Sequence, residues 1–522
     1  MEQNHPNGSA KMKSKLCLLV PLISLLSWQV HSKSHAEDIS PPGLGSISHS
    51  VGFQLLEDQD NSRVVSGEVS PTTIKFRPIR TYLWYPAKSS DNMKPMSFGR
   101  YAELANDDIW PGSMRTELKF SKKVLARSLG SEHYELLLQQ PVHAIEGAEA
   151  LGGPFPLVVI GQGLYYESPI VFAALAEYLA ERGFVVATCP LVGTKSPIVR
   201  MDIQDLETQV RDLEFVIARA RRLPFVSPDT LGVFGFDMGG MAGLILTMRN
   251  ADVDAFASVS SGILYERPDG IPTSSPHYDP LALRVPWFHS MPTYWIKPPD
   301  SKVVSLFDTA LNAERYLLLT KGMGHVDYTS YALIPDRSAM SGYWAASNSG
   351  IAKDHDTVNQ YIANFFSAFL KRDSISLEFL SQNPEQTMPG ASMTLDYRPA
   401  APTLITYEEF VKAVVTGEAE DAIKKVRALR ATVPDHTLLD ETYLERLVWS
   451  LRDTWGLSEK VMPVIQLRAE LFPQSNGAQR MLAEGFVDTN NFPDAIEIYK
   501  KLLEQDPDDA NSQARLEWLQ KQ

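Results

Sequence analysis

The sequence predicts two domains: an α/β domain with a mostly parallel sheet covered by helices on both faces, and an all-α domain after it. The first prediction comes from short apolar runs, suited to buried parallel strands, that alternate with helical stretches between about residues 155 and 325. The second comes from the helical pattern beyond residue 404, where Pro473 and Pro507 lie 34 residues apart, the tetratricopeptide period.

The elements of the α/β domain can be assigned in chain order. Apolar runs bounded by turn residues predict strands near 155–161, 184–189, 231–236, 255–259, 285–291 and 315–320. Helical spacing predicts helices near 170–182, 206–223 and 238–248. Most strands are therefore followed by a helix or a long connection, as a parallel sheet requires.

Residues 232–240 read Gly-Val-Phe-Gly-Phe-Asp-Met-Gly-Gly, the strand-turn-helix pattern of a nucleophile elbow. Gly235, Gly239 and Gly240 supply the conformational freedom and the close backbone packing that such a sharp turn needs. A hydrolase of this kind normally carries serine at the turn, whereas this chain carries Asp237.

Four motifs together resemble bacterial relatives of platelet-activating-factor acetylhydrolase and dienelactone hydrolase, over roughly residues 50–372. They are Arg-Pro-Ile-Arg-Thr-Tyr-Leu-Trp-Tyr-Pro-Ala at 77–87, the loop 161–164, the elbow, and Gly-Met-Gly-His at 322–325. The resemblance implies an α/β-hydrolase fold in which the elbow residue attacks an ester, a histidine moves the proton and an acid orients the histidine.

The resemblance also implies roles for particular residues. His325 corresponds to the family's histidine, and the backbone N–H groups of Gly163, Leu164 and Met238 correspond to oxyanion donors. Ser260 stands where acetylhydrolase-like relatives carry the orienting acid, so nucleophile and acid types look exchanged between two positions. In the dienelactone-hydrolase branch the acid follows the next strand, where Asp300 or Asp308 could serve.

Three interpretations of Asp237 remain open, because a helix N-terminus favours an ionised carboxylate in each of them. Asp237 could be a covalent nucleophile, as in haloalkane dehalogenases and epoxide hydrolases, with His325 activating the water that hydrolyses the enzyme ester. Its oxygen could instead fill the oxyanion hole and pair with a protonated His325, leaving an inactive relic. It could also act as a general base for water without covalent catalysis.

Other polar residues near the predicted site have less specific patterns. Gln162 occupies the oxyanion loop and acts there through its backbone, while Tyr165 and Tyr166 either bind a substrate oxygen or simply pack. Asp327 is expected as a solvated turn residue and His289 as a core histidine. No cluster of His, Cys, Asp and Glu has metal-site spacing, so neither a metal nor another cofactor is expected.

Composition fits a large globular protein with an acidic surface. The 522 residues are 44% apolar and 10% aromatic, and the formal net charge is −14. This charge argues against nucleic acid as a partner. The expected partners are an ester-like small molecule, if the site is active, and a protein bound through the C-terminal repeats.

The N-terminus resembles an export signal. Lys11, Lys13 and Lys15 precede the apolar run 16–26, and Ser-His-Ala at 34–36 offers a cleavage site. The predicted organisation is therefore a signal peptide at 1–36, an α/β-hydrolase domain at 42–372, a Pro- and Ser-rich linker at 373–403 and a tetratricopeptide-like domain at 404–522. The predicted location is periplasmic or extracellular.

The repeat pattern predicts which side chains are buried in the last domain. The expected core positions are Leu482, Phe486, Ala495, Ile498, Tyr499 and Leu502. Two functions remain in contention for the whole chain. One is an exported hydrolase of an ester or related bond, esterase- or acetylhydrolase-like, with aspartate at its elbow. The other is a degenerate hydrolase fold that acts as a binding or scaffold module through its repeats.

Overall fold

The computed structural model describes residues 49–64, 76–89, 94–106, 135, 138–164, 168–195, 198–265, 270–297, 304–333, 350–390, 392–401, 404–434 and 436–522. The predicted signal peptide, Tyr165, Tyr166 and Asp300 lie outside these residues. Among the described residues, no helix is both long enough and apolar enough to cross a membrane.

A ten-stranded sheet forms the centre of the first domain, in the order β10-β9-β8-β7-β6-β4-β5-β2-β1-β3. The strands are β1 (Ser50–Val64), β2 (Phe76–Ala87), β3 (Ala144–Glu146), β4 (Phe155–Gly161), β5 (Val185–Thr188), β6 (Val226–Phe236), β7 (Ala255–Val259), β8 (Trp287–Pro292), β9 (Arg315–Thr320) and β10 (Met393–Arg398). Strands β4 to β9 run parallel to one another, and β2 runs antiparallel to both β1 and β5. With the elbow directly after β6, this is the predicted α/β-hydrolase fold.

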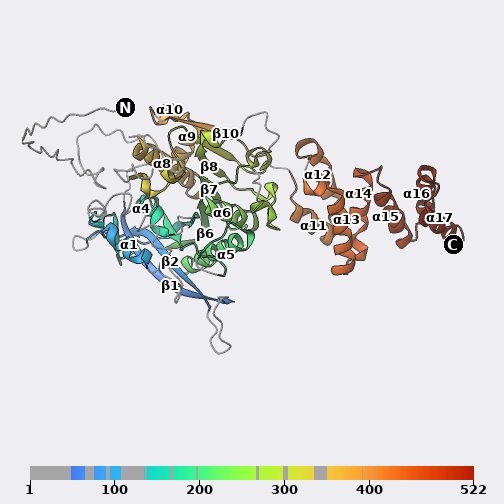
Figure 1. Ribbon diagram of the computed structural model, residues 1–522, viewed down its shortest axis with the longest axis horizontal. Helices are drawn as coiled ribbons and strands as arrows, with labels where there is room; N and C mark the ends of the chain where they lie inside the picture. Colours follow the sequence, from blue (N-terminus) through green and yellow to red (C-terminus); the bar gives the residue numbers. More distant parts are fainter. Residues whose placement is uncertain are drawn as a thin grey trace, which may run out of the picture.

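Helices cover both faces of this sheet, as predicted (Figure 1). They are α1 (Phe98–Asn106), α4 (Ala173–Glu181), α5 (Ile203–Ala220), α6 (Met238–Arg249), α7 (Leu306–Thr309) and α8 (Ile351–Leu370). Successive side chains of β4 point to opposite faces of the sheet, and both sets are apolar. Val158 and Ile160 belong to the core under α4 and α8, whereas Leu157 and Val159 belong to the core under α5 and α6. Burial on both faces requires the nearly continuous apolar runs from which the strands were predicted.

The linker predicted at 373–403 is wrong. This segment contains the helices α9 (Ser374–Ser381) and α10 (Pro384–Thr387), followed by β10, which pairs antiparallel with β9. Met393 is buried and Leu395 packs against the same core, so two apolar side chains tie the strand to the sheet. The prolines and serines of this segment lie at the ends of short elements, although in the sequence they indicated a loop.

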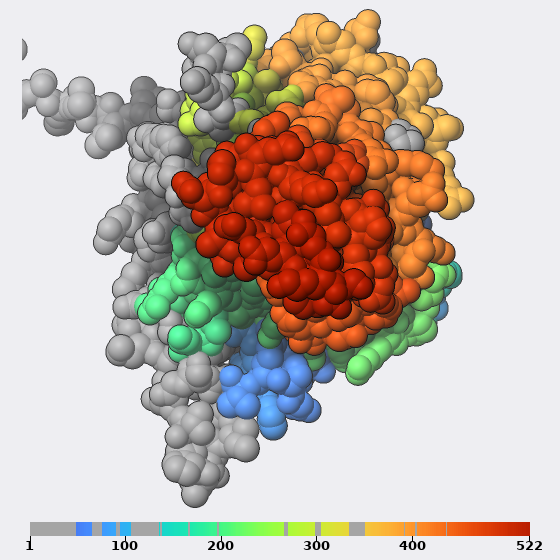
Figure 2. All heavy atoms as spheres, turned by 90° about the vertical axis from the view of Figure 1, so that its right-hand side faces the viewer, coloured from blue at the N-terminus to red at the C-terminus, as the bar shows by residue number. Residues whose placement is uncertain are grey.

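The C-terminal helical domain extends away from the hydrolase domain (Figure 1). Its helices are α11 (Tyr407–Thr416), α12 (Ala419–Thr432), α13 (Glu441–Trp449), α14 (Met462–Leu471), α15 (Asn476–Asp488), α16 (Phe492–Gln505) and α17 (Ala510–Leu519). Ala495, Tyr499 and Leu502 are buried as the 34-residue period predicted, while Leu482, Phe486 and Ile498 are partly buried. Seen end-on, this domain lies in front of the hydrolase domain (Figure 2).

Specific contacts dock the helical domain on the hydrolase domain. Leu281, in the short helix η3 (Pro280–Ala282), is fully buried within the core formed by α11 to α14. The Asn312 Nδ2 group donates hydrogen bonds to the carbonyls of Leu281 and Leu404, at 2.8 and 3.0 Å. The Asp279 carboxylate lies 3.5 Å from His436. These contacts show that the two domains share a packed interface.

Candidate active site

The elbow places Asp237 in a strained turn between β6 and α6. Its backbone angles are φ 49° and ψ −117°, a region that costs a non-glycine residue on the order of 1 to 3 kcal/mol. The turn brings Gly239 so close to the β4 end that an added Cβ would lie 2.1 Å from the Gly161 carbonyl oxygen. Only glycine fits there, which explains the glycine that follows the turn in the motif.

The structure brings the predicted oxyanion loop against Asp237. The backbone N–H of Leu164 donates to Oδ2 of Asp237 at 3.0 Å. Gly163 is so close that a Cβ on it would lie 2.9 Å from the Asp237 Cβ, and Met238 is fully buried at the first position of α6. One expected oxyanion donor is therefore bound to the carboxylate of the protein itself.

Polar side chains hold this loop in place. The Gln209 amide on α5 donates to the Gln162 carbonyl at 2.8 Å, and the Gln162 amide donates to Thr188 Oγ1 on β5, also at 2.8 Å. Gln162 is 1% exposed, so its side chain anchors the loop in addition to its expected backbone role. The N–H of Leu164 is thereby fixed in direction before any substrate binds.

His325 begins the short helix η5 (His325–Tyr328) after β9 and is 2% exposed. Its Nδ1 atom lies 2.8 Å from Oγ of Ser260. The imidazole is stacked on Phe236, with ring centroids 4.5 Å apart, and on Trp295, with centroids 5.7 Å apart. Two aromatic rings and one hydroxyl thus set the orientation of the histidine.

Ser260 occupies the position where an orienting acid was expected from the resemblance to acetylhydrolases. It follows β7 with φ 45°, and its N–H donates to the Ser290 carbonyl at 2.7 Å. The alternative acid Asp308 lies on α7 and forms an ion pair with Arg398 of β10, more than half exposed. The structure therefore brings Ser260, and not Asp308, to Nδ1 of His325.

The surroundings of His325 favour its neutral form. Burial lowers the pKa of His325 to about 4, although its hydrogen bond to Ser260 acts in the opposite direction. A protonated His325 paired with Asp237 would require a raised pKa. The lowered pKa therefore does not favour a relic held by that charged pair, because desolvation of the ring outweighs its hydrogen bond.

Two further expectations concern residues near the site. Asp327 is not solvated: it is fully buried, and its Oδ2 accepts the Gly324 N–H at 2.6 Å, which fixes the turn that presents His325. His289 is a buried core residue as expected, with Nδ1 2.8 Å from Ser258 Oγ and a pKa lowered by burial to about 3.

Trp295 was missed from the sequence. It ends the short helix η4 (Thr293–Trp295), which follows β8 at the carboxyl edge of the sheet. Side chains at this edge meet around the ligand site in open α/β sheets. The position of Trp295 just after a predicted strand was the signal that could have identified it.

No protein-family model and no curated protein matches this chain. Among solved structures, the chain is similar to a ferulic acid esterase from Streptomyces cinnamoneus, with 21% identity and a TM-score of 0.49. The alignment covers 68% of this chain and 97% of that chain. The fold assignment rests on the strand order and elbow of this chain itself, and the resemblance to acetylhydrolases and dienelactone hydrolases stays a prediction from the motifs.

Proposed function

We propose that this protein is a hydrolase of an ester or related bond in which the Asp237 carboxylate takes the place of the usual serine. The observation that carries the proposal is the 3.0 Å hydrogen bond from the Leu164 N–H to Oδ2 of Asp237. In a serine hydrolase such a donor receives the substrate's carbonyl oxygen. Here Asp237 occupies that donor, so the proposed reaction does not begin with a substrate carbonyl bound to Leu164.

In the proposed first step, Asp237 displaces a group that leaves a substrate carbon as an anion. A carboxylate oxygen of Asp237 forms a bond to that carbon, while the bond to the leaving group breaks and its electron pair leaves with that group. The product is an ester between Asp237 and the substrate's alkyl part. For an ester substrate, the leaving group is its carboxylate.

The second step in this proposal is hydrolysis of the enzyme ester. His325 accepts a proton from water through Nε2, since Nδ1 faces Ser260, and the hydroxide attacks Cγ of Asp237. The negative charge that develops on Oδ2 is stabilised by the Leu164 N–H already bound there. The bond between Cγ and the alkyl oxygen then breaks, and the imidazolium gives that oxygen its proton. Asp237 is left as a carboxylic acid, which loses the remaining water proton to solvent and is regenerated as a carboxylate.

A second candidate function is supported by the partner of His325. A serine hydroxyl stabilises an imidazolium less than a carboxylate does, and the pKa of about 4 makes His325 a weak base. The alternative is therefore a degenerate hydrolase fold that acts as a binding or scaffold module through the C-terminal helical domain, whose tetratricopeptide-like character is part of the same proposal.

The two functions can be separated by trapping the enzyme ester. His325→Gln removes the base for the second step, so incubation with a panel of benzyl esters, epoxides and haloalkanes should accumulate an adduct on the peptide containing Asp237. The adduct is detected by peptide mass spectrometry. In the His325→Gln protein, adding Asp237→Asn should abolish the adduct, whereas adding Asp254→Asn, at a carboxylate that accepts the Leu231 N–H, should leave the adduct unchanged.

Isotope labelling tests the same path in wild-type protein. Turnover of a reactive panel member in water enriched in ¹⁸O should place ¹⁸O in the Asp237 carboxylate, because water attacks Cγ. Label found only in the product would overturn the covalent mechanism. Absence of both turnover and adduct across the panel would favour the binding module.

Export is proposed as well, from the lysines and the apolar run that precede residue 37. Protein recovered from the periplasm or the medium is expected to begin at Glu37 on N-terminal sequencing. Retention in the cytoplasm with an intact N-terminus would contradict this location.

A further inference from the structure

The short stretch of chain that follows β7 contacts both residues of the candidate active site. The Ser260 hydroxyl lies 2.8 Å from Nδ1 of His325. The next residue, Ser261, donates a hydrogen bond from its hydroxyl to the backbone carbonyl of Asp237, at 2.6 Å. Ser261 is fully buried, so bulk water does not compete for this bond. Two consecutive serines therefore hold the histidine and the elbow.

A glycine of the elbow motif leaves room for the Ser261 side chain. A Cβ added at Gly240 would lie 2.5 Å from both Cβ and Oγ of Ser261. The next nearest atom, the carbonyl oxygen of Gly235, would be 3.4 Å away. Gly235 and Gly239 differ from Gly240, because a Cβ added at either of them would collide with backbone. The last glycine of the motif is therefore required by one particular side chain, that of Ser261.

Ser261 makes the shortest of three hydrogen bonds that the Asp237 carbonyl accepts. The other two come from the N–H groups of Gly240 and Met241, at 3.1 and 3.4 Å. The N–H of Asp237 donates to the Val259 carbonyl at 3.4 Å. With φ 49° and ψ −117°, Asp237 has a conformation that persists only where its surroundings impose it. The bond from Ser261 is the shortest contact that imposes it.

The direction of this carbonyl also determines the direction of a neighbouring donor. A trans peptide group is planar, so the N–H of Met238 points opposite to the Asp237 carbonyl. Ser261 therefore fixes, through one rigid peptide group, the N–H that is expected as an oxyanion donor together with that of Leu164. The Leu164 N–H already donates to Oδ2 of Asp237 at 3.0 Å.

We propose that Ser261 is a positioning residue that holds the peptide between Asp237 and Met238 for hydrolysis of the enzyme ester. Its hydroxyl contacts no reacting atom. The first step removes negative charge from the Asp237 carboxylate, whereas the second step restores it, so an aligned N–H donor favours the second step. This catalytic role rests on the proposed hydrolase function, but the hold on the peptide does not.

Crystal structures of variants test the hold on the peptide without any substrate. In Ser261→Ala, we expect the Asp237 carbonyl oxygen to move by more than about 0.5 Å, the tolerance within which an active-site group must be held. Gly240→Ala should produce a similar shift, because the added Cβ displaces the Ser261 hydroxyl. An unmoved peptide in both variants would refute the proposal, whether or not the protein is a hydrolase.

Rapid quenching followed by peptide mass spectrometry tests the catalytic role, with a benzyl ester that forms the adduct. Decay of the enzyme ester should be about tenfold slower in Ser261→Ala than in wild type, because the donor is misaligned and not removed. Formation of the ester should be unchanged, so kcat and KM should fall together while kcat/KM stays constant. Ser261→Cys retains a weak donor and should recover part of the decay rate. Equal slowing of both steps would count as general distortion of the site and refute the positioning role.

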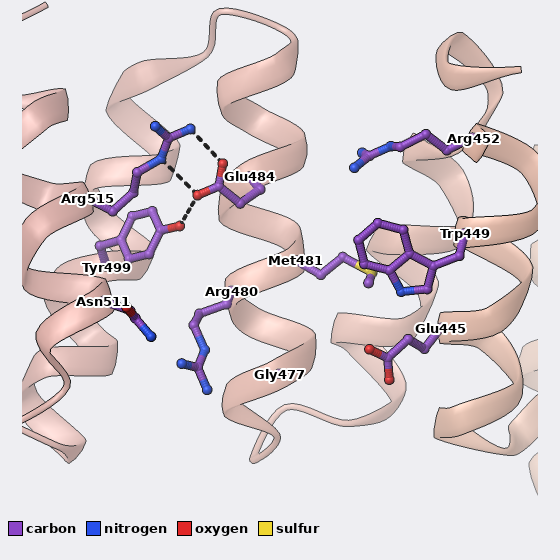
Figure 3. Close-up of a pocket in the computed structure, with 10 residues that line it drawn as sticks. All are labelled: Glu445, Trp449, Arg452, Gly477, Arg480, Met481, Glu484, Tyr499, Asn511 and Arg515. Atoms are coloured by element: carbon purple, nitrogen blue, oxygen red, sulfur yellow. Dashed lines mark hydrogen bonds and ion pairs between the residues drawn. The ribbon is translucent and has the colours of Figure 1, made fainter. Parts of the chain in front are cut away.

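Two control variants remove other buried hydroxyls. Thr247→Val breaks the 2.7 Å hydrogen bond from the Thr247 hydroxyl to the Gly243 carbonyl within α6. Tyr499→Phe removes a hydroxyl that donates to Glu484 in a pocket of about 410 Å³ on the C-terminal helical domain (Figure 3). Both variants should form and hydrolyse the enzyme ester at wild-type rates. Slower decay in either variant would show that the Ser261→Ala effect is one of stability alone.

The two kinds of experiment separate this proposal from the proposed function. If no ester, epoxide or haloalkane forms an adduct with wild type, the hydrolase function fails and the catalytic role of Ser261 fails with it. The crystal structures then still decide whether the hydroxyl holds the peptide. If the adduct forms and decays equally fast in wild type and Ser261→Ala, the hydrolase function stands and only the role of Ser261 is refuted.

Discussion

Asp237 and Ser260 share an unusual backbone conformation at the ends of two adjacent strands. Their φ angles are 49° and 45°, and β6 and β7, which they follow, are paired in parallel. Such angles persist only where the surrounding structure imposes them. The backbone therefore fixes where these two side chains lie, while the side chains determine which chemistry is possible there.

The exchange of residue types between these positions leads to a prediction. Asp237→Ser alone should give little esterase activity, because the Nδ1 atom of His325 faces a hydroxyl. Adding Ser260→Asp places a carboxylate near Nδ1, which raises the pKa of His325 and orients the ring. Hydrolysis of p-nitrophenyl acetate should then rise by on the order of 10² or more over the single variant.

A fluorophosphonate probe gives the matching control, since it requires an activated hydroxyl. It should label residue 237 in the double variant and leave the wild-type elbow unlabelled. Equal activity in the single and double variants would show that another group already orients His325.

Because burial lowers the pKa of His325, the stability of the protein is expected to fall as the pH falls. Its folded pKa of about 4 lies below the unfolded value of about 6.5, so the unfolded chain binds the proton first as pH falls. The native state therefore loses stability between about pH 6.5 and pH 4, by at most about 3 kcal/mol from this residue. Above pH 6.5 this loss is absent.

His325→Gln cannot take up that proton and isolates the effect. The difference in melting temperature between wild type and His325→Gln, measured from pH 7.5 to pH 4.5, should shift in favour of the variant as pH falls. His289 remains in both proteins, so its own acid sensitivity cancels. Parallel curves for the two proteins would contradict the lowered pKa.

At the scale of elements, the short helix η3 and Asn312 belong to the interface between the two domains. Asn312→Ala removes two hydrogen bonds and leaves the buried carbonyls of Leu281 and Leu404 without these donors. We expect the free energy of unfolding to fall by about 1 to 3 kcal/mol and α11 to be attached more loosely to the hydrolase domain. Limited proteolysis between β10 and α11 should become faster.

Asn250→Ala serves as the control for this change. Its side chain accepts only a local turn hydrogen bond from the Asp252 N–H, away from the interface. Cleavage between β10 and α11 at the same rate in both variants would show that other contacts hold the domains together.

Local chemistry explains which elements could be predicted from the sequence. The elbow was predictable because positions 235 and 239 must be glycine. A side chain at either position would collide with neighbouring backbone, and this requirement is visible in the sequence as a motif. β10 was not predictable, because its half-exposed residues become a strand only through pairing with β9. The burial of Asp327 has no local signature, since it depends on the surrounding fold. Trp295 had only its position after a predicted strand, which does not show that its ring stacks on His325.

At the scale of the whole molecule, stability should decrease toward the C-terminus. The core of α11 to α14 includes Leu281 of the hydrolase domain, whereas the last core contains only Ala483, Ala495, Tyr499, Leu502 and Leu519 as buried members. The last helices of a stacked helical array contact neighbours on one side only, so they open first. Hydrogen exchange should therefore be fastest in α16 and α17 and slower in α11 to α14, and uniform protection would contradict this order.

β10 also determines where the chain could be cut to obtain the hydrolase domain as a separate fragment. A fragment ending at Leu370 would leave the whole edge of β9 unpaired, including the apolar run Leu317 to Leu319. Such an edge is a template for intermolecular strand addition, and so for fibrous aggregates. In the intact chain that edge is covered by β10, which carries the charged residues Asp396 and Arg398. The hydrolase domain is thus expected to stay soluble on its own only if the break falls after Arg398.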